Sequence, residues 1–237
     1  MSDLNLPHVP GRDDPAAVWD RLSHRYDRQL WLERRSVASA VTLLDPGADE
    51  RCLDAGTGTG EVLRQLMARP QPPREVTGVD ASPGMLSHVG ELPAGWSVRH
   101  GDLRRLPVPD ASVDAVTASY VLHLLAPEDL PVALAELHRV LVPGGRLVSV
   151  TPAVPPRGLA RPLARALDRL SHRRPDAYRG LRALDPRAEL TRAGFRLERA
   201  RWNLQGYPAL CVLARRPGSG TSASARLTTP TTARNSA

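Results

Sequence analysis

Arg51–Asp80, RCLDAGTGTGEVLRQLMARPQPPREVTGVD, decides the fold. It predicts a strand, a turn in which Gly56, Gly58 and Gly60 alternate with other residues, a helix, and a second strand that ends on Asp80. Glycines at this spacing allow a tight turn and let a ligand lie against the backbone. The free amides at the start of the helix add partial positive charge, and an acid at the end of the second strand can bind both hydroxyls of a ribose. The stretch therefore predicts a site for a nucleoside-containing cofactor.

The spacing of the turn separates two kinds of cofactor. The dinucleotide fingerprint is G-x-G-x-x-G, whereas this chain has the tighter D-A-G-T-G-T-G, with Asp54 at its first position. A carboxylate there would repel a pyrophosphate and attract a cation. S-adenosylmethionine carries a sulfonium and an ammonium group, so it suits this turn.

A resemblance to a known family extends well beyond the turn. The stretch resembles motif I of class I S-adenosylmethionine-dependent methyltransferases, and segments similar to the later motifs follow in order. They are the ribose segment at 79–86, the adenine segment at 101–107, the fourth strand and its exit at 112–123, and the helix, Pro-Gly-Gly turn and fifth strand at 134–147. Residues 18–27 and 195–214 resemble the N-terminal helix and closing hairpin of the ubiquinone/menaquinone C-methyltransferase (methyltransferase type 11) branch.

This resemblance implies an α/β, Rossmann-like fold: a seven-stranded, mostly parallel sheet with helices on both faces and an antiparallel C-terminal hairpin. The domain division expected from it has four parts. They are a helical N-terminal lid at 1–45, a cofactor-binding domain at 46–216, a basic helical insertion within it at 152–187, and a disordered tail at 217–237.

The resemblance also implies which residues hold S-adenosylmethionine. By motif position they are Asp54, Gly56, Gly58, Thr59 and Gly60 at the methionine end, Asp80 and Ala81 at the ribose, Asp102, Leu103 and Met85 at the adenine, and Ser119 at the amino-acid portion. A buried core position is the alternative for the Met85 side chain.

The candidate catalytic and substrate-contacting residues lie after the fourth strand and in the N-terminal lid. His123 is the candidate general base, because the ends of parallel strands open into the cleft, and a structural histidine is the alternative. Tyr26 and Tyr120 are the candidate substrate contacts, and His24 and Tyr26 are weaker candidates for the base. No metal site is predicted.

The amino-acid composition limits which binding partners and which cellular compartment are expected. The 237 residues carry a net charge of +7, but the chain contains no lysine and no isoleucine, so part of its basicity reflects a biased composition. We therefore expect no nucleic acid partner. Cys52 and Cys211 lie in apolar strand patterns, and no segment has the length of apolar sequence that a membrane helix needs, so a cytoplasmic location is predicted.

Arginines recur every fourth residue within 157–174, which favours a solvated helix face, with contact to an anionic or membrane-resident substrate as the alternative.

The predicted function is methyl transfer from S-adenosylmethionine to a small-molecule acceptor, a quinol, phenol or other secondary metabolite, at carbon or oxygen. The aromatic-rich signatures expected after the fifth strand are replaced by arginine and proline, so the acceptor stays open. The alternatives are an RNA methyltransferase, suggested by the net charge, and a non-catalytic member that only binds the cofactor. A nicotinamide oxidoreductase is disfavoured by the loop spacing and the missing lysine.

Overall fold

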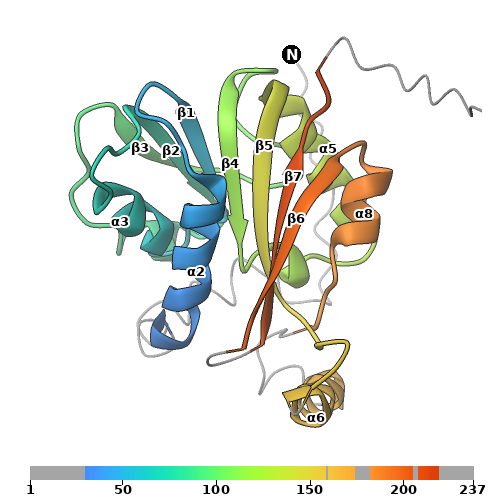
Figure 1. Cartoon of the computed structure of the whole chain (residues 1–237). Helices are drawn as coiled ribbons and strands as arrows, with labels where there is room; N and C mark the ends of the chain where they lie inside the picture. The colour runs from blue at the N-terminus through green and yellow to red at the C-terminus, as the bar shows by residue number, and fades with distance from the viewer. Residues whose placement is uncertain (1–29, 159, 174–181, 205–207, 219–237) are drawn as a thin grey trace, which may run out of the picture.

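A seven-stranded sheet forms the centre of the molecule (Figure 1). The computed structural model describes residues 30–158, 160–173, 182–204 and 208–218. The strands are β1 (Arg51–Ala55), β2 (Glu75–Asp80), β3 (Trp96–His100), β4 (Val113–Ser119), β5 (Leu141–Pro152), β6 (Arg196–Asn203) and β7 (Ala209–Arg215). They are arranged in the order β3-β2-β1-β4-β5-β7-β6, and β7 runs antiparallel to both of its neighbours. The predicted fold class is therefore confirmed.

Successive side chains of the central strands enter opposite cores. Cys52 and Ala115 belong to the hydrophobic cluster on one face of the sheet, whereas Leu53 and Val116 belong to the cluster on the other. Side chains alternate along a strand, so a strand covered on both faces must be largely apolar on both of them. This explains why the central strands have no polar face.

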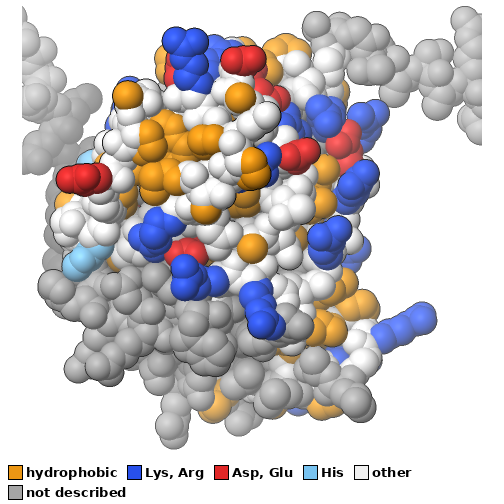
Figure 2. All heavy atoms as spheres, turned by 60° about the vertical axis from the view of Figure 1, so that its left-hand side comes forward, with side chains coloured by type: hydrophobic (Ala, Val, Ile, Leu, Met, Phe, Trp, Pro, Cys, Tyr) orange, Lys and Arg blue, Asp and Glu red, His pale blue; other side chains and the backbone are white. Residues whose placement is uncertain are grey.

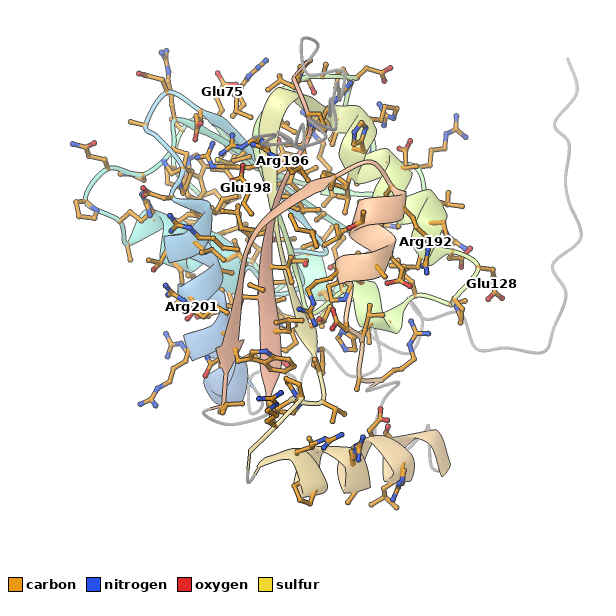
Figure 3. All side chains as sticks on the ribbon, turned by 45° about the vertical axis from the view of Figure 1, so that its right-hand side comes forward. Glu75, Glu128, Arg192, Arg196, Glu198 and Arg201 are labelled. Atoms are coloured by element: carbon orange, nitrogen blue, oxygen red, sulfur yellow. The ribbon has the colours of Figure 1, made fainter. Side chains whose placement is uncertain are left out.

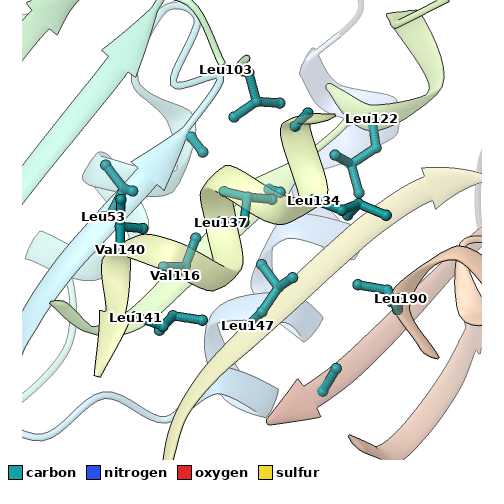
Figure 4. Packing of buried hydrophobic residues seen from close by; sticks show 14 of the residues in the cluster. Leu53, Leu103, Val116, Leu122, Leu134, Leu137, Val140, Leu141, Leu147 and Leu190 are labelled. Carbon is teal, nitrogen blue, oxygen red and sulfur yellow. The ribbon is translucent and has the colours of Figure 1, made fainter. Parts of the chain in front are cut away.

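Helices cover both faces. On one face lie α2 (Leu30–Leu44) and α3 (Glu61–Met67), and on the other lie α5 (Leu130–Val140) and α8 (Arg187–Arg192). Figure 4 shows Leu134 and Leu137 of α5 against the sheet, and both side chains are fully buried. Burying a leucine side chain contributes about 1.5–3 kcal/mol, so this contact holds α5 in place. The short α4 (Pro83–Leu86) and the 3-10 helix η1 (Leu122–Leu124) follow β2 and β4.

The link between α5 and β5 differs from the sequence expectation. The Pro143-Gly144-Gly145 turn was expected to separate the helix from the fifth strand, but β5 already begins at Leu141. The turn lies inside the strand as an irregularity, because Val113 pairs with Leu141 and Ala115 next pairs with Arg146. Gly144 has a φ of +83°, which a side-chain-bearing residue rarely adopts, so glycine permits the irregularity.

The basic insertion contains the predicted helix, α6 (Ala160–Arg173). In Figure 3 this helix stands apart from the sheet, far from the end of β6 that carries Arg196 and Glu198. Its Asp168 side chain accepts a hydrogen bond from the Ala183 amide over 3.0 Å, which ties it to the segment leading to α8. The predicted helix at 18–27 and nearly all of the predicted tail lie outside the described residues. Within the part of the chain that the structure describes, no helix is long and apolar enough to cross a membrane.

Candidate cofactor site

A cavity of about 620 Å³ opens where the parallel strands end. Loops that follow β1, β2, β3 and β4 line it together with Glu33 and Val37 of α2. Ligands of open parallel sheets bind at this edge, because the loops there are free to vary while the strands stay fixed. Ten of the residues predicted from the sequence line the cavity. They are Gly56, Gly58, Thr59, Asp80, Ala81, Met85, Asp102, Leu103, Ser119 and Tyr120.

The glycine turn lies close against its neighbours. The Gly56 and Thr57 amides both donate to the Val79 carbonyl, over 2.8 and 3.0 Å, which draws the turn onto β2. A Cβ on Gly56 would lie 2.6 Å from the Val121 side chain, and the φ of Gly56 is +77°. A Cβ on Gly58, at φ +54°, would meet nothing within 4 Å. The backbone at Gly58 is therefore open to a ligand, as the spacing predicted.

Asp54 lies beneath the turn and is not among the described residues that line the cavity. Its side chain is 1% exposed and accepts hydrogen bonds from the hydroxyls of Thr57, over 2.7 Å, and Thr117, over 2.6 Å. Burial raises the pKa of this carboxyl to about 6, although the two hydroxyls lower it in part. The structure thus places Asp54 as a brace of the turn and as a source of negative charge behind the cavity wall.

Asp80 joins the turn to the next loop. Its carboxylate accepts from the Gly58 amide over 2.7 Å and from the Ser82 amide over 2.9 Å. These two bonds fix the acid at the carboxyl end of β2 while it faces the cavity. An acid held in this way can accept from vicinal hydroxyls, which is the role that the resemblance implies.

Two buried hydroxyls in the cavity wall supply a test of fit for a ligand. Thr59 Oγ1 and Ser119 Oγ have no hydrogen-bond partner among the described residues, and both residues line the cavity. Buried polar atoms are rarely left unpaired, so a ligand with polar groups is expected to meet them. The amino-acid portion of S-adenosylmethionine carries an ammonium and a carboxylate, and it therefore fits this wall.

The charge of the cavity is opposite to that of the chain. The acidic residues lining it are Glu33, Glu61, Asp80, Asp102, Glu128 and Asp129, whereas Arg104 is its one arginine among the described residues. On the face shown in Figure 2, blue arginine groups are scattered, several beside red acidic groups, and do not form one continuous patch. The site therefore attracts a cation more readily than a polyanion.

His123 occupies a different place from the other predicted residues. It is 5% exposed, and it is not among the described residues that line the cavity. Its Nδ1 has no partner within the described chain, and burial lowers its pKa to about 3, with a smaller contribution from the Arg182 charge. Its ring contacts that of Tyr120 edge to face at 6.3 Å, and Tyr120 itself lines the cavity. Tyr26 and His24 lie outside the described residues.

The backbone is strained where β4 meets the cavity. Tyr120 adopts a φ of +55°, a left-handed conformation that is rare for a large side chain. Its amide donates to the Val150 carbonyl over 2.8 Å, which holds the residue in place. Burial raises the pKa of its phenol well above the usual range, so the group stays a neutral hydrogen-bond donor.

An ion pair at the adenine end of the cavity was not predicted from the sequence. Arg104 donates to Asp102 through Nη2 over 2.6 Å and to Asp129 through Nη1 over 3.1 Å. The Asp102 partner is two residues away in the chain and follows a strand, but Asp129 is 25 residues away, at the start of α5. No short-range sequence pattern signals a contact of that kind.

Comparison with known proteins supports the class that fold and cavity define. The sequence profile of a methyltransferase domain family matches residues 53–149. The demethylmenaquinone methyltransferase of Deinococcus radiodurans is 39% identical over 175 residues, which cover 67% of this chain and 70% of that protein. A malonyl-[acyl-carrier protein] O-methyltransferase of Serratia marcescens is 35% identical over 136 residues, 57% of this chain and 51% of that protein. The chain thus spans only about half the length of the second relative.

A solved structure gives the same fold. A putative methyltransferase of Haloferax volcanii, in complex with the Trm112 methyltransferase activator, superposes with a TM-score of 0.70 at 18% identity, over 86% of this chain and 98% of that one. The class is thus that of Rossmann-like, class I methyltransferases. Within it, the chain belongs to the S-adenosylmethionine-dependent methyltransferase domain family, in the branch of the ubiquinone and menaquinone C-methyltransferases. The cofactor of this family is S-adenosylmethionine.

Proposed function

We propose that the protein transfers a methyl group from S-adenosylmethionine to a small-molecule acceptor, at oxygen or carbon. One observation carries the proposal. One acidic cavity is lined by the open backbone at Gly58, by the fixed Asp80 carboxylate, and by Thr59 and Ser119, whose buried hydroxyls have no partner among the described residues. Together they suit a cationic adenosyl amino acid and would repel phosphates.

The chain's own residues are proposed to act mainly by binding and orientation. Bound S-adenosylmethionine supplies an electrophilic methyl group on a sulfonium, so the protein must align a nucleophile with it and exclude water. Asp80 and Ala81 would hold the ribose, Asp102 and Leu103 the adenine, and Thr59 the amino-acid portion. Tyr120 would donate a hydrogen bond to the acceptor from the end of β4.

The position of His123 bears on which acceptor is used. A buried imidazole with a pKa of about 3 is a weak base, and the Tyr120 ring that it contacts lines the cavity whereas His123 is not among the described lining residues. This placement favours an acceptor that is already ionised, such as a carboxylate or an acidic phenol, over one that must lose a tightly held proton. If the acceptor must instead lose a proton before it is methylated, His123 remains the proposed base.

A row of arginines on α6 is consistent with an anionic acceptor. Arg161, Arg165 and Arg169 recur along α6 and form no ion pair with a described acidic side chain, and we call them the α6 arginine face. The Arg182 side chain donates to the carbonyl of Leu125, a residue that lines the cavity, over 3.0 Å. We propose that the α6 arginine face attracts the anionic acceptor toward the cavity.

Cofactor binding is tested first, by calorimetric titration with S-adenosylmethionine and with S-adenosylhomocysteine. We expect binding in the micromolar range, lost in Asp80→Ala and retained in Asp49→Ala, an exposed acid remote from the described cavity lining. No binding to the wild-type protein at high micromolar concentration would refute the proposal. Binding to tRNA with a steep salt dependence would instead favour an RNA substrate.

Turnover is tested next, by mass spectrometry with a panel of quinols, phenols and carboxylic acids. A product heavier by one methylene unit is the expected result. In Arg165→Glu, kcat/KM for the acceptor should fall while cofactor affinity stays the same. Arg74→Glu, at an exposed arginine immediately before β2, should leave both unchanged. Cofactor binding without any methylated product across the panel and a cell extract would favour the non-catalytic alternative.

A further inference from the structure

One guanidinium connects two walls of the cavity. Arg104 lies in the loop after β3, where its Nε and Nη2 donate to the Asp102 carboxylate over 3.0 and 2.6 Å. Its Nη1 donates to Asp129 Oδ2 over 3.1 Å. Asp129 is the N-cap residue immediately before α5, and all three residues line the cavity. Arg104 is therefore a bridge between the β3 loop and the first turn of α5.

The bridge leaves Asp102 little capacity for other donors. A carboxylate has about four acceptor positions, and the Arg104 backbone amide, Nε and Nη2 occupy three of them on Asp102. About one position therefore remains for a ligand. A single exocyclic amine, such as that of adenine, can fill it while the Arg104 bonds persist.

We propose that Arg104 closes over the adenine base of the bound cofactor, with Asp129 as its anchor, and thereby slows release of the cofactor. The inference rests on the cofactor site proposed above. A guanidinium is planar and stacks on flat rings while it still donates at its edges to carboxylates. The Arg104 side chain is 49% exposed, so it stands at the rim of the cavity, between the base position beside Asp102 and solvent.

The competing explanation is that Arg104 only holds the empty loop in place. Exposed ion pairs contribute little to stability, so such a role would leave the release rate of the cofactor nearly unchanged when Arg104 is replaced. A closing role predicts the opposite: release becomes faster, association changes little, and the effect of Asp129 depends on the presence of Arg104. Release kinetics therefore separate the two explanations.

The experiment measures association and dissociation rates of S-adenosylhomocysteine by stopped-flow fluorescence, on the full chain. Arg104→Ala should raise the dissociation rate about ten-fold, and Arg104→Lys should give an intermediate rate, since an ammonium cannot bridge two acids in the same plane. Asp129→Asn should raise it about three-fold, and should add nothing in the Arg104→Ala background. Arg105→Ala, the neighbouring exposed arginine, is the matched control and should behave as wild type.

Two results would overturn the inference. One is a wild-type dissociation rate in Arg104→Ala, and the other is an Asp129→Asn effect of the same size with and without Arg104. In both cases, loss of binding in Asp80→Ala would show that the proposed cofactor site stands. If the wild-type protein binds no cofactor, or Asp80→Ala binds it normally, the site itself is misplaced and the inference falls with it.

Discussion

Replacing Asp54 by asparagine should make the protein more stable at neutral pH and change how its stability depends on pH. The carboxyl is buried beneath the glycine turn and has no cationic partner among the described residues; Thr57 and Thr117 only donate hydroxyl hydrogen bonds to it. An amide of the same shape can accept from one hydroxyl and donate to the other. It therefore keeps the contacts and removes the buried charge.

The magnitude follows from the pKa. Burial raises the pKa of Asp54 from 3.8 to about 6. Below about pH 4 both the folded and the unfolded chain hold the proton, whereas between about pH 4 and 6 only the folded chain keeps it. The free energy of unfolding therefore falls as the pH rises through this window. A difference of 6 − 3.8 = 2.2 in pKa corresponds to about 3 kcal/mol, at about 1.36 kcal/mol for each pKa unit.

The assay is urea unfolding of the wild type and of Asp54→Asn at intervals between pH 4 and 7.5. The free energy of unfolding of the variant, minus that of the wild type, should increase by about 2 kcal/mol from pH 4 to pH 7, since at pH 4 the unfolded chain has already released part of the proton. Carboxylates elsewhere cancel in this difference because both proteins contain them. Asp49→Asn, at an exposed acid, should give a curve parallel to that of the wild type. A difference that stays constant with pH, or that decreases, would refute the reasoning.

Three further predictions test other parts of the structure. Gly56→Ala should weaken S-adenosylhomocysteine binding at least about ten-fold in a calorimetric titration, because the new Cβ would lie 2.6 Å from Val121 at a φ of +77°, whereas Gly47→Ala, with only ordinary contacts, should bind normally. We expect His123→Gln to lose less thermal stability than the wild type when the pH is lowered from 6.5 to 4. The unfolded wild-type chain takes up a proton on this histidine near pH 6.5, whereas burial keeps the folded ring neutral down to about pH 3. Equal losses in the two proteins would contradict the burial of His123. Leu137→Ala should lower the free energy of unfolding in urea by about 2–5 kcal/mol, and a loss below about 1 kcal/mol would mean that α5 is not packed as described.

The part of the fold carried by local patterns was predictable from the sequence. β2 ends on Asp80 as expected, because short apolar runs bounded by turn residues define buried strands. The start of β5 was not predictable from the sequence. That strand begins where Leu141 pairs with Val113 on a neighbouring strand, and the local Pro-Gly-Gly sequence does not decide it.

The candidate site also has a part that was predictable from the sequence and a part that was not. Backbone features, such as the open approach at Gly58, follow from residue type and spacing, so the sequence indicated them. The side-chain environment does not: the sequence placed Asp54 at the mouth of the turn, but two hydroxyls hold it beneath, and one of them comes from Thr117, 63 residues away. Likewise the Arg104 bridge depends on α5 beginning beside the β3 loop, which only the assembled sheet determines.

The strand order also has a consequence for biosynthesis. β7, the last described strand in the sequence, lies between β5 and β6 and bonds to both, with its cysteine beside Val150 on one side and Arg201 on the other. While a ribosome is still translating the region before Ala209, the open edge of β5 has no neighbour and β6 has nothing to join. A nascent chain in that state presents a bare, apolar sheet margin that invites pairing with another copy. Chaperone capture should accordingly be strongest just before β7 emerges, and should cease once it is inserted.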